Sequence, residues 1–176
     1  MQNTVKTIIL CGSILIANSV MPKSACAEVN ITGNDVSAQH QIAFMLGITP
    51  RAGFFGLQPG VFYNLPLLTE KGLAPKLRDS FYIEMGAYLF TYFGIGNTLG
   101  LIPMVGPRWS LHLTDKWDVF ATLKLGAYVV ITPAVIAGFG FNSSLGAHYM
   151  FSDNLGAFVE IGVCRAAFQI GISSRF

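Results

Sequence analysis

The chain has 176 residues, of which 52% are hydrophobic and only 11% are charged, and its formal net charge is +2. A soluble domain normally carries about 25% charged residues, so this composition favours a membrane protein or a domain of many closely packed strands. The chain is long enough for one domain, and without a basic patch it is not expected to bind nucleic acid.

Residues 1–27 have the features of a secretory signal peptide. Lys6 provides a positive start, residues 7–21 are mainly apolar, and the small-x-small sequence ACA precedes Glu28. One alternative is a retained N-terminal helix, although the stretch is short for a membrane span. The other is a lipoprotein signal acylated at Cys26, although Lys23 lies where that signal has an aliphatic residue. Cleavage would leave nine acidic and nine basic residues, and it would leave Cys164 as the one cysteine, which excludes an internal disulfide or a cysteine-based metal cluster.

The remaining chain contains eight segments in which apolar residues alternate with small or polar residues, which is the period of a β-strand. These segments lie at about 40–50, 55–65, 79–93, 100–113, 117–131, 135–151, 155–164 and 166–176. The polar sequences LTDKW and FSDN between later segments are typical of tight turns. We expect residues 28–38 to form a flexible arm and residues 39–176 to form the folded domain.

Two long stretches without charge, residues 85–107 and 125–152, could instead be transmembrane helices on hydropathy alone. Gly, Pro and Asn interrupt both stretches, and the alternation continues through them. In WDVFATLKLGAYVVI, for example, Trp117 and Val119 share one face, whereas Asp118 and Lys124 share the other. These observations favour strands.

An open sheet in lipid would leave unpaired backbone groups at its edges, so a membrane sheet must close. Transmembrane strands need about 9–11 residues, which the segments provide, and eight strands form a small barrel whose interior is filled by side chains. The predicted fold is therefore all-β, an eight-stranded antiparallel transmembrane up-and-down β-barrel.

The signal peptide, the alternating segments and the terminal Phe176 together resemble the small outer-membrane β-barrels of Gram-negative bacteria, the OmpA-like and OmpX-like group. The segments GPRWSLHLTDKWDVFATLKLGAY and GAHYMFSDNLGAFVEIGV look like late hairpins of that group. The resemblance implies a location in the outer membrane, contact with its lipid, and recognition by the barrel-assembly machinery. The residues that match this recognition pattern are Phe168, Ile170, Ile172 and Phe176, whereas Ser174 departs from it.

The resemblance also implies that both chain termini are periplasmic. The short connections near residues 51–55, 94–99, 132–134 and 164–166 would then face outward. The longest connection, residues 66–80, would be periplasmic and could contact a partner, which reverses the usual distribution of long and short loops. Pro103 and Pro107 predict a bulge or kink in their strand, because proline removes hydrogen bonds from the sheet.

The inward faces of the strands carry the candidate functional residues. Because buried charges are costly unless paired, we expect a lumen charge network of Glu84, Arg108, Lys124 and Glu160. Further polar residues predicted for the lumen are His112, His148, Gln169 and Arg175. Aromatic residues expected at the membrane interface are Trp109, Trp117, Tyr149 and Phe151.

These features predict a non-enzymatic membrane component with an envelope or surface role, without cofactor or metal. A narrow channel for ions or small solutes, in which the charge pairs switch partners, is the first alternative. An acyl hydrolase acting on lipid A, with Ser110 and His112 as a nucleophile–base pair, is the distant alternative. His40, His112 and His148 lie on different strands without local ligand spacing, so no metal site is predicted.

Overall fold

A computed structural model describes residues 38–51, 54–68, 77–93, 98–131, 135–163 and 167–176. The predicted signal peptide, nearly all of the predicted arm and Cys164 lie outside these residues.

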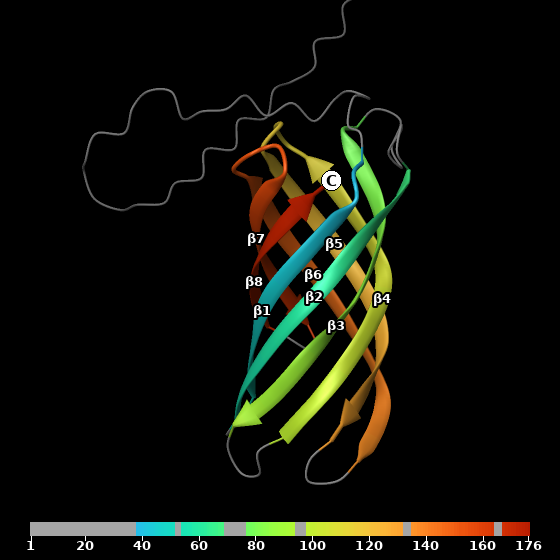
Figure 1. The fold of residues 1–176 in the computed structure, drawn as a ribbon, viewed down its shortest axis with the longest axis vertical. Coiled ribbons are helices and arrows are strands. Elements are labelled where there is room, and N and C mark those ends of the chain that lie inside the picture. The colour runs from blue at the N-terminus through green and yellow to red at the C-terminus, as the bar shows by residue number, and fades with distance from the viewer. Residues whose placement is uncertain (1–37, 52–53, 69–76, 94–97, 132–134, 164–166) are drawn as a thin grey trace, which may run out of the picture.

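Eight antiparallel strands close into a barrel, in which each strand pairs with its neighbours in sequence and β1 pairs with β8 (Figure 1). The strands are β1 (Gln41–Arg51), β2 (Phe54–Leu68), β3 (Asp79–Phe93), β4 (Thr98–His112), β5 (Trp117–Val130), β6 (Ile136–Met150), β7 (Leu155–Val163) and β8 (Phe168–Arg175). The predicted all-β, eight-stranded antiparallel fold is confirmed. The uncharged residues 85–107 belong mainly to β3 and β4, and residues 125–152 belong mainly to β5 and β6. In the described residues, no helix is long and apolar enough to cross a membrane.

Alternation along each strand separates the two surfaces of the barrel. On β5, Leu123 and Leu125 face outward and are about half exposed, whereas Thr122 and Lys124 face inward and are buried. The outer surface is a belt of exposed apolar side chains that includes Phe44, Val61, Leu89, Leu101, Val105, Phe141, Val159 and Ile172. An apolar exterior around a polar interior is the arrangement expected of a barrel that crosses a membrane.

The predicted bulge at Pro103 and Pro107 is wrong. Strand β4 pairs with β3 without a break through both prolines, and its pairs with β5 resume in the same register after each of them. Both prolines are exposed on the outer surface. The missing N–H groups therefore interrupt the ladder toward β5 without displacing a residue. The register shift lies instead in β2, between Pro66 and Leu68.

The connection predicted at residues 66–80 is shorter than expected, because β2 continues to Leu68 and β3 begins at Asp79. Arg78 is held against the barrel, since its backbone oxygen accepts a hydrogen bond from the His112 N–H and its guanidinium contacts Asp115 at 2.7 Å. Asp79 is buried and accepts a hydrogen bond from the Trp109 indole. The chain therefore enters β3 in a fixed position.

The start of β1 and the end of β8 lie at the same end of the barrel, together with the turns after β4 and β6 (Figure 1). There the N–H of Phe176 donates to the backbone oxygen of His40 at 3.0 Å, which secures the last residue beside the start of β1. This end of the barrel is called the terminal rim below.

Glycines on the inner face let neighbouring strands approach closely. A side chain added at Gly106 would meet the backbone oxygen of Leu123, and one added at Gly126 would meet the backbone oxygen of Pro103. At Gly60 and Gly146 the added carbon would instead meet the rings of Tyr88 and Phe120. These rings belong to the apolar cluster inside the barrel, which consists of Ala43, Met45, Phe62, Tyr88, Phe90, Ile102, Met104, Phe120 and Phe158.

Candidate functional site: the filled lumen

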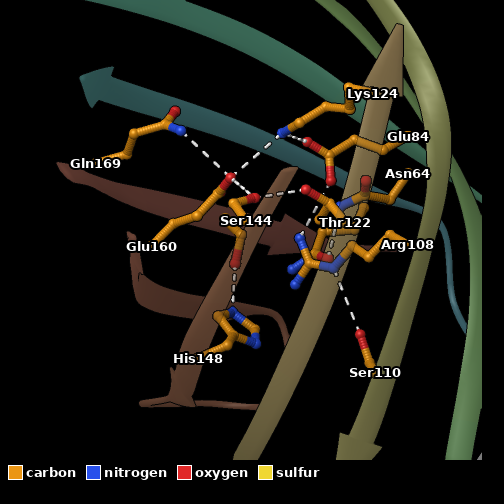
Figure 2. A network of polar contacts seen from close by, with 12 residues as sticks. Asn64, Glu84, Arg108, Ser110, Thr122, Lys124, Ser144, His148, Glu160 and Gln169 are labelled. Carbon is orange, nitrogen blue, oxygen red and sulfur yellow. Dashed lines mark hydrogen bonds and ion pairs between the residues drawn. The ribbon is translucent and has the colours of Figure 1, made fainter. Parts of the chain in front are cut away.

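A group of ion pairs centred on Lys124 lies inside the barrel (Figure 2). The Lys124 ammonium on β5 lies 2.7 Å from one carboxylate oxygen of Glu84 on β3 and 3.5 Å from a carboxylate oxygen of Glu160 on β7. Arg108 on β4 lies 3.7 Å from the other oxygen of Glu84. All four side chains are buried, and their ion pairs connect strands β3, β4, β5 and β7 inside the barrel.

Neutral polar groups complete the surroundings of Glu160. Ser144 donates a hydrogen bond to the Glu160 carboxylate and also contacts the hydroxyl of Thr122. The Gln169 amide donates to the same carboxylate at 3.3 Å and accepts from the Tyr88 hydroxyl at 2.8 Å. Because buried ion pairs are favourable only when their remaining polar atoms are also satisfied, these partners help to offset the cost of burying Glu160.

Aromatic rings provide a second kind of partner for the two cations. The Arg108 guanidinium carbon lies 3.8 Å from the centre of the Phe120 ring, and the Lys124 ammonium lies 4.7 Å from the centre of the Phe62 ring. Cation–π contacts of this kind are strongest where water is excluded. The apolar cluster and the ion pairs are therefore in direct contact and fill the lumen together.

A second polar cluster lies between the ion pairs and the terminal rim, and its centre is Asp118. The carboxylate of Asp118 lies 2.8 Å from His148 Nδ1, 2.8 Å from the Arg175 guanidinium and 3.7 Å from His112 Nδ1. Strands β4, β5, β6 and β8 each contribute one of these side chains. A single buried carboxylate thus connects half of the strands of the barrel.

Each histidine of this cluster also contacts a serine through its other ring nitrogen. Ser80 lies 2.7 Å from His112 Nε2, and Ser173 lies 2.7 Å from His148 Nε2. The pairing of Ser110 with His112, which the distant alternative of an acyl hydrolase required, is not present, because Ser110 instead accepts a hydrogen bond from Arg108 at 3.4 Å. The register between β3 and β4 explains the difference. It places Ser80, at the start of β3, opposite Ser110 and therefore beside His112 at the end of β4.

The order serine, histidine, aspartate is that of a nucleophile, a general base and an orienting acid. Ser80 and Ser173 are only 1% and 2% exposed, however, so an ester outside the barrel cannot reach either hydroxyl in this conformation. These contacts hold strands together in the observed state. Sequence analysis did not predict Asp118, Ser80 and Ser173 as members of the site; the alternation indicates the inward position of Asp118, but its partners depend on strand register.

The other predicted residues lie on the faces expected for them. Gln169, His148 and Arg175 point inward, whereas Phe168, Ile170, Ile172 and Phe176 are exposed on the outer surface at the last strand. Trp117, Tyr149 and Phe151 form a continuous aromatic group at the terminal rim, with ring centres 4.8 and 5.7 Å apart. Trp109 differs from them, because it is partly buried and its indole N–H donates to Asp79 at 2.7 Å.

No family model and no curated protein matches the chain. Among solved structures, the chain is similar to a protein described under "De novo design of transmembrane beta-barrels", with a TM-score of 0.51 and 15% identity. The match covers 82% of this chain and 100% of the designed chain. This likeness supports the fold alone. The fold and the side-chain contacts together define the class of the protein as a closed eight-stranded antiparallel barrel with an apolar exterior and an ion-paired polar interior.

Proposed function

We propose that the protein is an integral outer-membrane barrel of a Gram-negative envelope, with a structural or surface role and without enzymatic activity. The observation that carries this proposal is the contrast between the two surfaces of one closed sheet. Lys124, Glu84 and Glu160 are almost fully buried inside, whereas half-exposed Leu, Val, Ile and Phe side chains cover the outside. In water this exterior would be costly, whereas lipid would make it favourable.

The location and the biogenesis partners belong to the same proposal. The exposed Phe168, Ile170, Ile172 and Phe176 on β8 would be recognised by the barrel-assembly machinery during insertion. Residues 66–80, or the part of them outside β2 and β3, would face the periplasm and could contact a partner there. Replacing Phe176 by Ser should lower the amount of assembled barrel in outer-membrane fractions more than replacing the inward Ser173 by Ala.

The test of the proposal is the gel mobility of the detergent-extracted mature protein, boiled and unboiled, together with its circular dichroism. A closed membrane barrel resists detergent unfolding until it is heated, so a mobility shift with a β-rich spectrum is expected. Recovery of the protein in outer-membrane fractions completes the test. A soluble protein without a shift, or recovery with the inner membrane, would contradict the proposal.

A narrow channel is the second candidate, and the position of Glu84 is the observation that favours it. Glu84 lies between two cations, at 2.7 Å from Lys124 and 3.7 Å from Arg108, so a small movement would exchange one partner for the other. The apolar cluster beside this pair opposes ion passage, because Phe90, Ile102 and Met104 offer no polar groups to an ion. Planar-bilayer conductance of the native protein and of Lys124→Gln and Arg108→Gln variants decides between the two.

Hydrolysis of lipid A acyl chains remains the distant alternative. The burial of Ser80 and Ser173 argues against it, since the reaction needs a serine that the ester can reach. Membranes with and without the protein should therefore contain lipid A with the same acyl chains. Loss of a chain that depends on Ser173, but not on Ser174 of the outer face, would establish the enzyme instead.

A further inference from the structure

A groove in the outer wall of the barrel interrupts the belt of large side chains around it. It has a volume of about 460 Å³, and nearly all of the surface that lines it is apolar. This volume is within the range of roughly 300–1,000 Å³ in which ligand pockets fall. Its walls are formed by side chains of β4, β5, β6 and β7, among them Trp109, Val119, Leu145, Val159 and Ile161.

The groove arises from small residues on two adjacent strands. Ala121 on β5 and Ala147 on β6 face outward between the larger side chains of Val119 and Leu145. Each alanine is paired with a larger residue, Ala121 with Leu145 and Ala147 with Val119. The alanines therefore form a floor between raised edges, and Trp109 on β4 and Val159 on β7 close the two sides.

The position of the groove along the strands places it near the terminal rim. Trp117 pairs with Tyr149 only two residues closer to the turns than the pair of Val119 and Ala147. At about 3.3 Å per residue along a tilted strand, the groove begins within roughly 5–10 Å of the aromatic rim. In a membrane this is the depth of the first part of an acyl chain, directly below the head groups.

An exposed lysine lies in a turn at the terminal rim, next to the strands that form the groove. Lys116, in the turn between β4 and β5, is exposed, and its backbone oxygen accepts a hydrogen bond from the N–H of Met150 at the end of β6. The hydroxyl of Thr114 accepts from the backbone N–H groups of Lys116 and Trp117, which orders the turn. A positive side chain thus lies beyond the same two strands that form the floor of the groove.

We propose that this groove binds one phospholipid of the leaflet at the terminal rim, with an acyl chain along Ala121 and Ala147 and the phosphate near Lys116. The inference rests on the proposed membrane location. The groove is continuous with the lipid-facing belt, so lipid chains are what reach it. The apolar groove fits an acyl chain. The aromatic pair of Trp117 and Tyr149 fits the glycerol region, and Lys116 fits the phosphate.

The test is native mass spectrometry of the detergent-extracted full mature protein after addition of palmitoyl-oleoyl-phosphatidylethanolamine. The wild-type barrel is expected to retain one lipid. Ala147→Phe fills the groove and should reduce retention about tenfold, the effect of losing contact with roughly two buried methylene groups. Lys116→Gln should reduce it about fivefold, the effect of one cation near a lipid phosphate.

Ala127→Phe is the matched control, because Ala127 also faces outward on β5 but lies outside the groove. Ala121→Leu, a smaller change in the same floor, serves as the second groove variant if Ala147→Phe assembles poorly. Equal retention in the groove variants and the wild type, or equal loss in Ala127→Phe, would overturn the proposal. A dimer that Ala147→Phe abolishes would also overturn it, since the groove would then bind a second copy.

A boiled and unboiled gel of each sample separates this result from the proposed function. If all variants show the mobility shift, differences in lipid retention report on the groove alone. If the wild type shows no shift, the membrane barrel itself is refuted, whatever lipid it retains.

Discussion

Lys124 and Glu84 lie forty positions apart in the chain, yet their charged atoms are 2.7 Å apart in the centre of the barrel, and both side chains are almost fully buried. They come from β5 and β3, with β4 between them. The pair therefore connects two strands that are not hydrogen-bonded to each other. It stabilises the closed barrel only because both charges have each other and further polar partners.

Removal of the Lys124 charge should strongly destabilise the barrel. Lys124→Met leaves Glu84 and Glu160 as buried carboxylates without their nearest cation, and breaking a buried pair from one side costs about 3–5 kcal/mol. Urea unfolding of the protein in lipid vesicles, followed by the mobility shift, measures this free energy. Lys124→Met combined with Glu84→Gln should lose less than the sum of the single changes; additive losses would mean that the pair is not coupled.

Replacement of Asp118 should destabilise the barrel much more than replacement of Asp115, although both carboxylates contact an arginine at a similar distance. Asp118 is buried and holds His148 and Arg175, whereas Asp115 is 89% exposed and contacts Arg78. Hydrogen bonds to a buried charged group are worth about 1.5–3 kcal/mol each, whereas an exposed pair contributes about 0–1 kcal/mol. Urea unfolding should show a large loss of unfolding free energy for Asp118→Ala and little loss for Asp115→Ala.

An added methyl group on the inner face should be costly where it meets backbone. In Gly106→Ala the new carbon would collide with the Leu123 carbonyl, so strands β4 and β5 must separate. Overpacking of this kind costs about 1–3 kcal/mol. Gly56→Ala is the control, because its nearest neighbour is the ring of Tyr92, which can rotate away. Equal unfolding midpoints for the two variants would contradict the close approach of β4 and β5.

A charge on the outer wall should be penalised according to its depth. Leu125, well inside β5, and Leu155, at the start of β7 near the terminal rim, are exposed to almost the same extent, 48% and 45%. Arginine near the middle of a bilayer costs about 2–4 kcal/mol, against about 0–1 kcal/mol near its surface. Vesicle-refolded Leu125→Arg should therefore be less stable than Leu155→Arg. In a water-exposed barrel the two changes would have similar effects.

Strand positions and the orientation of each strand follow from the alternation itself, because a period of two leaves little choice of face once one side is apolar. The alternation of β5, β6, β7 and β8 is enough to assign Lys124, His148, Glu160 and Gln169 to the inner faces. Closure into a barrel follows from the requirement that backbone groups be paired in lipid. These are local or general constraints, and they are carried by the order of residues alone.

Contacts between side chains are decided by the tertiary structure, because they depend on the register of strands that are distant in sequence. His112 contacts Ser80 rather than Ser110, and Asp118 joins His148 to Arg175. Pro103 and Pro107 remain in register because their missing donors fall on one side of β4. A shift of two residues in any pairing would keep every side chain on its face but would change every partner, so only the closed barrel determines which charges meet.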